Sequence, residues 1–333
     1  MKRIVCGFLV ALLAMPAIRA DEKPKEEKKP PTPKEQYQAL AKEFMSERQK
    51  IISEIQKTKG PEQKKLIQKY MEAGKDFAEK FYKLADDNSK DPVATDAYFW
   101  IVQNAMGSPP YAKAIARIKS SIAEMPLAEL SRRFNNNTRL SDESIMEAIF
   151  KRVEKDEKEP AAVDLLSWLA VNGVPNPDTR PLGQKASKRL IEKFPDHPGV
   201  ERLCMVLGQG FVPDADETLK LIFEKATKER VKAAAALGIA KTLATKTDEL
   251  GDKPAELDKT AAEAEKYFTM VIDQYGKDNA ALKSTAEKEL KSFRTFRVGK
   301  EAPDIKAADL DEKEFKLTDY RGKVVLLDFW GNW

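Results

Sequence analysis

Apolar side chains recur at three- to seven-residue intervals through most of this chain of 333 residues. Between Pro33 and about Arg294 nearly every segment has the period of an amphipathic helix. Gly60-Pro61 interrupts the first such stretch, and this pair stops a helix. Two apolar stripes joined by a tight break predict an antiparallel helical hairpin. The stripes consist of Tyr37, Leu40, Phe44, Ile51 and Ile55 before the break, and of Leu66, Tyr70, Phe77, Phe81 and Leu84 after it.

A unit made of an amphipathic helix, a short polar turn and a second helix then recurs. It occurs at residues 77–102, 186–208, 216–243 and 264–290, with irregular spacing. Units of this kind cannot bury their apolar faces alone and stack into solenoids. Residues 34–296 therefore resemble a tetratricopeptide-like helical-repeat body, and an irregular helical bundle is the alternative.

The composition changes after Phe296. Short alternating or apolar runs, Phe315 to Leu317 and Val324 to Trp330, are separated by turn residues, which is the pattern of strands. The second run has the composition of a strand buried on both faces. We therefore predict a mainly α protein in which a helical-repeat body is followed, in residues 297–333, by the first strands of an incomplete α/β domain.

The N-terminus has the three-part pattern of a secretory signal peptide over residues 1–20. Lys2 and Arg3 precede an apolar stretch from Ile4 to Ala14, which is shorter than the about 20 residues that a spanning helix needs. Residues 21–33 are charged and proline-rich, which predicts a disordered linker. We expect an exported protein, periplasmic or extracellular, with no stable membrane insertion after cleavage.

The net charge and the cysteine and histidine content limit the classes of function and site that this chain could have. Loss of Lys2, Arg3 and Arg19 with the signal lowers the formal net charge from +4 to +1, so nothing favours nucleic-acid binding. Cys204 and His197 are then the only cysteine and histidine, which excludes an internal disulfide and a multi-histidine metal site. We predict no metal and no cofactor.

Three motifs in the last residues together resemble the entry to a thioredoxin-like redoxin domain, of the exported thiol–disulfide oxidoreductase and alkyl-hydroperoxide-reductase type. Gly299 to Pro303 is similar to the opening G-x-x-A-P turn, and Leu317 to Lys323 is similar to the segment before the first central strand. Val324 to Trp333 is similar to that strand and the start of the active-site loop. Glu312 departs from the family, which commonly has glycine in this turn, and a positive φ there strains a residue with a Cβ.

The resemblance implies thiol–disulfide exchange or peroxide reduction, with electrons from a dithiol partner or with a protein as substrate. In the family a Cys-x-x-Cys pair would follow Trp333 directly. The 333 residues therefore contain no catalytic residue, and Trp330, Gly331, Asn332 and Trp333 only flank the active site. We expect this chain to be inactive as an oxidoreductase.

Several explanations for the position of Trp333 stay open. Cysteine codons differ from the stop codon UGA by one base, so a nonsense mutation or a selenocysteine codon would end the chain there. An incomplete gene sequence, a frameshift or a deliberately shortened chain would do the same. A non-enzymatic alternative is a helical-repeat scaffold that binds a peptide or partner protein through its concave surface.

Three other features have a structural interpretation. Cys204 stands among apolar residues at helical spacing, which is typical of a buried thiol. His197 precedes Pro198 and reads as a turn residue. Asn135 to Thr138 contains an N-x-T glycosylation pattern, and we interpret it as an amide-rich loop.

Deleting residues 297–333 is expected to leave the thermal unfolding midpoint nearly unchanged and to raise solubility. The reason is that Val324 to Trp330 is apolar, β-prone and without partner strands, which favours aggregation. Calorimetry and a solubility assay of the deleted and full-length chains measure the two effects. A large fall in the midpoint would contradict the prediction.

Overall fold

The computed structural model describes residues 30–135, 142–156, 159–309 and 311–328, and most of these residues are helical. A π-helical turn, η1 (Val271–Tyr275), extends α12, and the C-terminal part holds β1 (Lys306–Ala308), β2 (Glu314–Lys316) and a 3-10 turn, η2 (Leu317–Tyr320). The helices in the described residues are α1 (Pro33–Lys57), α2 (Pro61–Asp87), α3 (Pro92–Asn104), α4 (Tyr111–Ile122), α5 (Leu127–Asn135), α6 (Glu143–Lys155), α7 (Pro160–Gly173), α8 (Arg180–Lys193), α9 (Pro198–Leu207), α10 (Ala215–Lys225), α11 (Glu229–Asp248), α12 (Pro254–Met270) and α13 (Ala280–Phe296).

The predicted helical hairpin is confirmed at α1 and α2. Thr32 caps α1 through a capping box with Glu35, so the helix begins at Pro33, the last residue of the predicted linker. Residues 21–29 of that linker and all of the predicted signal peptide lie outside the described residues. Gly60 has a φ of 71° between the two helices, a conformation that glycine adopts without strain.

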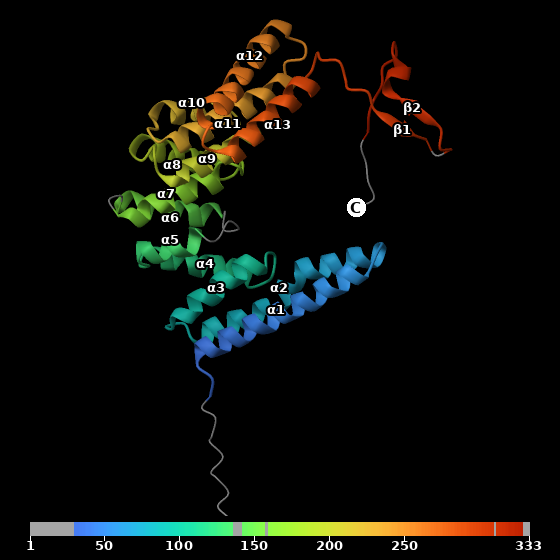
Figure 1. Ribbon diagram of the computed structural model, residues 1–333. Coiled ribbons are helices and arrows are strands. Elements are labelled where there is room, and N and C mark those ends of the chain that lie inside the picture. Colours follow the sequence, from blue (N-terminus) through green and yellow to red (C-terminus); the bar gives the residue numbers. More distant parts are fainter. Residues whose placement is uncertain (1–29, 136–141, 157–158, 310, 329–333) are drawn as a thin grey trace, which may run out of the picture.

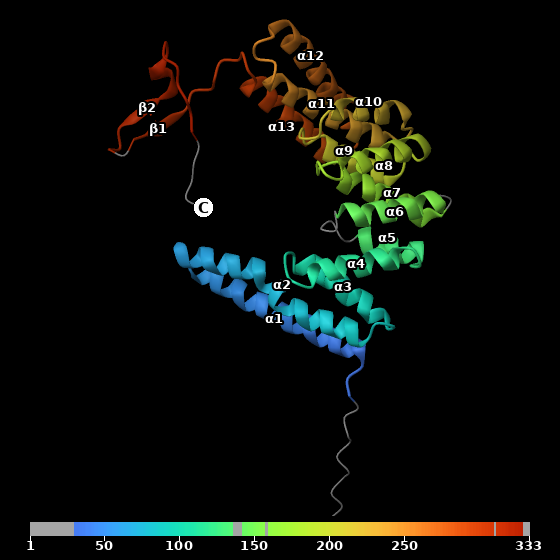
Figure 2. The ribbon, with the colours of Figure 1, turned by 180° about the vertical axis from the view of Figure 1, so that it is seen from behind.

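The helices stack one after another into an elongated, curved array (Figures 1 and 2). Contacts join mainly neighbours along the chain, such as α1 with α2, α7 with α8 and α11 with α12. Each of the four predicted units is a pair of helices joined by a turn: α2–α3, α8–α9, α10–α11 and α12–α13. This confirms a mainly α fold, and the tetratricopeptide-like assignment stays a prediction.

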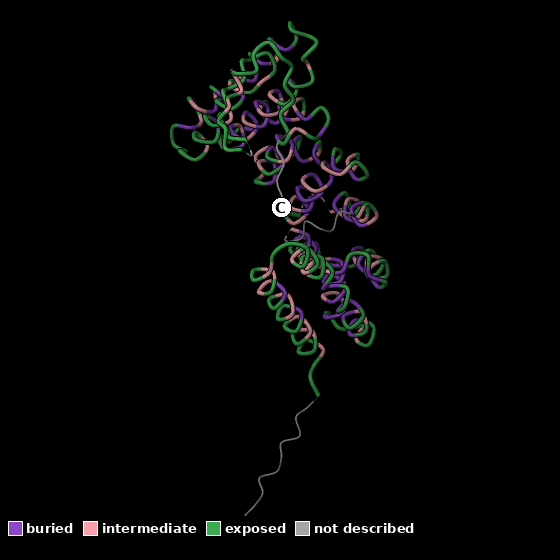
Figure 3. Tube along the Cα trace, turned by 90° about the vertical axis from the view of Figure 1, so that its right-hand side faces the viewer, coloured by how far each residue is buried: buried purple, intermediate pink, exposed green. Residues whose placement is uncertain are grey.

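Aromatic rings fill the core between the first three helices. The rings of Phe81 and Trp100 are stacked with centroids 3.7 Å apart, and Phe44 meets Trp100 edge to face at 4.9 Å. Phe81 is fully buried, as the predicted stripe requires. Buried positions recur along the inner sides of the helices throughout the array (Figure 3), so one core cluster extends from α1 to α13.

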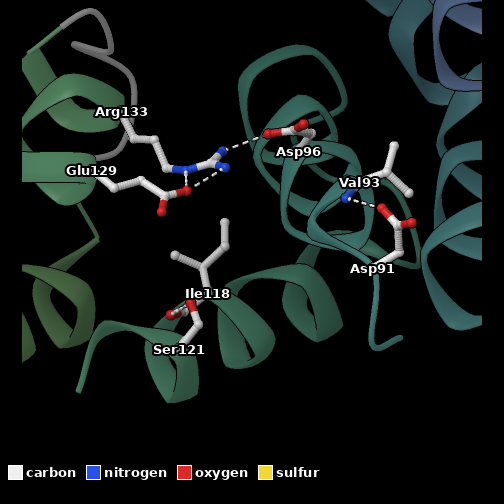
Figure 4. Close-up of polar contacts among 7 residues, drawn as sticks. All are labelled: Asp91, Val93, Asp96, Ile118, Ser121, Glu129 and Arg133. Carbon is white, nitrogen blue, oxygen red and sulfur yellow. Dashed lines mark hydrogen bonds and ion pairs between the residues drawn. The ribbon is translucent and has the colours of Figure 1, made fainter. Parts of the chain in front are cut away.

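A polar contact joins α3 to α5 at the side of this core (Figure 4). The guanidinium of Arg133 donates to Asp96 Oδ1 at 2.7 Å and to Glu129 Oε1 at 2.8 Å, and it lies 5.1 Å from the ring centroid of Phe99. Only 11% of the Arg133 side chain is exposed. Nearby, Asp91 Oδ1 caps α3 by accepting the N–H of Val93 at 2.9 Å.

One predicted strand is wrong for the residues that the structure describes. Residues 324–328 form no strand, and Val324 and Leu326 are almost fully exposed instead of buried. A strand exists only as part of a ladder, and no described segment pairs with these residues. The prediction at Phe315 is confirmed by β2, which pairs antiparallel with β1, a strand that the sequence analysis missed.

Replacing Arg133 with alanine is expected to lower the free energy of unfolding by about 2 kcal/mol, because two charge-assisted hydrogen bonds are lost and Asp96 and Glu129 keep an uncompensated charge. Arg294→Gln is the control, since the Arg294–Glu265 pair is exposed and should cost less than about 1 kcal/mol. Urea unfolding followed by circular dichroism measures both, and equal losses would contradict this interpretation.

Candidate functional site

The C-terminal segment, residues 297–328, begins where α13 ends and carries the motifs that resemble a redoxin. Near its start Gly299 has a φ of 84°, and the chain turns away from the helix there. The antiparallel pair of β1 and β2 follows, with Ala307 opposite Phe315. Glu312 has a φ of 62° in the turn between the strands, so the predicted positive φ at a residue with a Cβ is confirmed.

Hydrogen bonds fix the chain on both sides of this hairpin. Leu317 donates its N–H to the carbonyl of Ile305 at 2.9 Å. Asp304 Oδ1 accepts the N–H of Thr318 at 3.0 Å, and this bond lowers the pKa of the Asp304 carboxyl. Arg321 forms an ion pair with Glu301. These contacts bring the G-x-x-A-P turn next to the segment that precedes Val324.

A shallow hollow of about 280 Å³ results between these two stretches. Its lining includes Asp304, Thr318 and Tyr320 on the polar side, and Val325 and Leu327 on the apolar side. Two of the four apolar residues of the run 324–327 thus line this hollow, and the other two project into solvent, with Leu326 93% exposed. The predicted flanking residues Trp330, Gly331, Asn332 and Trp333 lie outside the described residues.

The Cys204 thiol is fully buried on α9, as the sequence predicted. Burial raises its pKa far above the ordinary value for cysteine, with a smaller contribution from Glu201. The thiolate is the reactive form of cysteine, and this environment suppresses it. Cys204 is therefore a packing residue and not a redox nucleophile.

His197 is a turn residue, as predicted, and it also caps α9. Its Nδ1 accepts the N–H of Gly199 at 3.1 Å, and its Nε2 lies 3.3 Å from Asp164 Oδ1 on α7. Since Nδ1 is an acceptor, the proton of the neutral ring is on Nε2, where it points to Asp164. Both nitrogens are used within the fold, so the ring has no free position for acid–base catalysis.

Sequence reasoning missed the capping role of His197, although the His-Pro-Gly order at the start of a helical stripe was a signal for it. Burial is the main cause that lowers the pKa of His197. The charge of Asp164 opposes this change, and the positive charges of Arg202 and Lys228 add to it. The glycosylation pattern at Asn135 to Thr138 cannot be placed, because 136–141 lie outside the described residues.

The described residues contain neither a metal-binding cluster nor a membrane-spanning helix. No group of three or more His, Cys, Asp or Glu side chains in this part of the chain is arranged to hold a metal ion. No helix within the described ranges is long and apolar enough to cross a membrane.

Comparison with known proteins supports a partial similarity to thiol–disulfide oxidoreductases. No protein-family model matches the chain. Short stretches match the thiol-disulfide oxidoreductase ResA of Geobacillus thermodenitrificans at 58% identity over 36 residues, and that of Geobacillus kaustophilus at 56% over 36 residues. The ResA of Bacillus thuringiensis subsp. konkukian matches at 50% over 38 residues.

These stretches make up 11% of this chain, and the chain spans about a fifth of the length of these curated relatives. A solved structure described as "Computational Design of Self-Assembling Cyclic Protein Homooligomers" covers 79% of this chain and 93% of its own, at 15% identity and a TM-score of 0.22. That score is too low to define a shared fold. A short part of the chain is thus similar to a thioredoxin-like oxidoreductase.

Stability is expected to fall as the pH drops from 7.5 to 5.5, and part of this fall should come from His197. The pKa of the His197 ring is lowered in the folded protein. Its contribution to the free energy of unfolding is therefore fully present when the pH is above the ordinary histidine pKa of about 6.5. As the pH falls below this value, the unfolded chain is protonated more readily than the folded protein. The contribution of His197 to stability is therefore lost between the ordinary pKa and the lower pKa of the folded state.

His197→Asn keeps an N-cap acceptor that does not titrate, so its loss over this pH range should be smaller than that of the wild type. His197→Ala removes the cap and should cost about 1 kcal/mol at pH 7.5. Urea midpoints at both pH values measure these differences. Equal pH dependence of the wild type and the Asn variant would show that His197 is not responsible.

Proposed function

We propose that residues 297–333 are the beginning of a redoxin-type domain. In this proposal the intact protein catalyses thiol–disulfide exchange or peroxide reduction outside the cytoplasm. The observation that carries this proposal is the 58% identity over 36 residues to a thiol-disulfide oxidoreductase. We assign the matching stretch to residues 297–333, since the redoxin-like motifs lie there and this range has nearly the same length.

The local geometry supports this assignment. Gly299 opens the segment with a positive φ, and the hairpin then returns the chain so that Asp304 binds the N–H of Thr318. A new stretch of chain begins at Val324 after the hairpin. The apolar side chains of residues 324–327 are exposed. Such side chains are suited to a central strand once further strands and covering helices are present.

The reaction requires a Cys-x-x-Cys pair, which residues 1–333 do not contain. We place this pair directly after Trp333, at the start of a helix that lowers the pKa of the first thiol. Its thiolate would attack a substrate disulfide, form a mixed disulfide and release one substrate thiolate. The second cysteine would then displace the other substrate sulfur, so the substrate gains two electrons and the pair becomes a disulfide. A dithiol partner would reduce the pair again.

In this proposal the other segments serve export and positioning. Residues 1–20 direct the chain across the membrane, 21–33 form a linker, and the helical-repeat body of 34–296 holds the redoxin-type domain or its substrate. Export explains the use of a protein dithiol as the electron source, since the cytoplasmic thiol pool does not reach that compartment.

Sequencing of the source DNA and transcript beyond codon 333 is the first test. We expect a reading frame that encodes Cys-x-x-Cys and a further redoxin-length segment, either in frame, after a UGA codon or after a frame break. Selenium-sensitive mass spectrometry of the native product then distinguishes cysteine from selenocysteine. A downstream sequence without such a pair would contradict the proposal.

Insulin reduction in the presence of dithiothreitol tests the chemistry. The 333-residue chain is expected to match the uncatalysed rate, since Cys204 is buried and its thiolate is suppressed. The extended product should accelerate the reaction, and replacement of its first active-site cysteine or selenocysteine with serine should abolish this gain. Activity of the 333-residue chain that disappears in Cys204→Ala would instead assign the chemistry to α9.

A further inference from the structure

Residues 301–328, the C-terminal unit, are held together by contacts within the unit. The ion pair of Arg321 with Glu301 joins the two sides of the hairpin. All hydrogen bonds of the described residues of this unit are also internal, such as those that hold Leu317 and Thr318 to the start of the unit. The ring of Phe315 meets a tyrosine of the same unit, Tyr320, with centroids 6.4 Å apart. The unit thus keeps its local structure without the helices.

Burial gives no sign of a contact between this unit and the helical body. Among the described residues from 298 to 328 none is buried. Phe315, Leu317 and Thr318 are half-buried, and they lie where the unit packs on itself. Figures 1 and 2 show the unit standing apart from α12 and α13. A large, hydrophobic interface between two parts of a chain would fix their orientation, and burial of this kind is missing from the described part of the unit.

The helical body is ordered up to Val298. The backbone N–H of Arg297 donates to the carbonyl of Phe293, and the Arg297 guanidinium lies 5.6 Å from the ring centroid of Phe293. Val298 lies over the turn between α11 and α12, since a Cβ on Gly251 would be 3.5 Å from Val298 Cγ1. The C-terminal unit begins at Glu301, which is paired with Arg321. Two residues therefore connect the body with the unit.

These two residues, Gly299 and Lys300, have few constraints. Gly299 has a φ of 84°, and a Cβ on it would meet nothing within 4 Å. Glycine adopts positive and negative φ about equally, so rotation here has a low cost. Both residues are exposed, and the N–H of Lys300 donates to the carbonyl of Arg297 at 3.2 Å. One backbone hydrogen bond is little resistance to a change of φ and ψ.

We propose that Gly299 and Lys300 form a hinge, about which the C-terminal unit rotates as one piece relative to the helical body. Hinges are short connecting segments that absorb large φ and ψ changes between units that keep their own structure. The hinge allows the unit to meet a partner without a rearrangement of the helices. This inference does not depend on the redox proposal, because the hinge and its two sides lie within residues 297–328 and need no redox chemistry.

Distances between spin labels test the hinge. Labels at Lys288→Cys on α13 and Glu314→Cys on β2 span it, and both positions are exposed. Labels at Lys246→Cys on α11 and Lys288→Cys form the control pair within the body. The chain carries Cys6→Ser, and Cys204 is buried and takes no label. Pulsed dipolar spectroscopy is expected to give a distance distribution at least about twice as wide for the pair across the hinge.

Two glycine substitutions then separate a free hinge from a docked unit. Gly60 and Gly299 both have a positive φ and both have open space around them, so Gly60→Val is the matched control for Gly299→Val. Valine is strained at a positive φ. Gly60 lies between two packed helices, so its substitution should lower the thermal unfolding midpoint by about 2 °C or more. At Gly299 the free unit moves to relieve the strain, so the midpoint should stay unchanged and the mean distance from Lys288 to Glu314 should change.

Two outcomes would overturn the proposal. One is a distance distribution across the hinge that is as narrow as that of the pair within the body. The other is a fall of the midpoint in Gly299→Val that equals the fall in Gly60→Val, with an unchanged distance. That result would show that contacts with the body hold Gly299 at its positive φ. Far-UV circular dichroism of each variant at low temperature verifies that the helices are folded.

Discussion

No helix in the part of the chain that the structure describes buries its apolar face without neighbouring helices, and this dependence determines the architecture. Phe44 on α1, Phe81 on α2 and Trp100 on α3 form one aromatic contact, so none of the three helices keeps its core alone. The same rule holds at the other end, where Phe268 on α12 meets Phe293 on α13. Because most contacts join helices that are next to each other or one apart in the chain, the array grows in one direction.

Small residues let this array close around α11. Val231, Ala235, Ala236 and Ile239 on this helix are fully buried, and α9, α10, α12 and α13 all contact it. A helix with alanine and glycine on several faces allows its neighbours to approach closely, as Gly208 and Gly238 show.

The sequence predicts the elements that depend on a local pattern of residues. It does not predict the elements whose structure depends on a partner far away in the sequence. The hairpin at Gly60-Pro61, the helix pairs and the burial of Cys204 follow from periodicity and turn residues, and the structure has them. Residues 324–328 have the composition of a buried strand, but a strand needs neighbours that composition does not supply. β1 was missed because Lys306–Ala308 carries no strand pattern and is held only by its pairing with β2.

The contacts that give the molecule its chemistry are also long-range. Arg133 reaches Asp96 from another helix, and His197 reaches Asp164 across 33 residues of sequence. In the sequence both residues look like ordinary polar positions. Arg297 is a further case, since its place in the sequence does not show that two of its nitrogens are buried without a hydrogen-bond partner.

Arg297 marks the point where the helical body ends and the C-terminal segment begins. Its backbone N–H donates to the carbonyl of Phe293 at the end of α13, and the chain turns away at Gly299 two residues later. No pairing in the described residues joins β1 or β2 to the helices, so the hairpin departs from the body at this point.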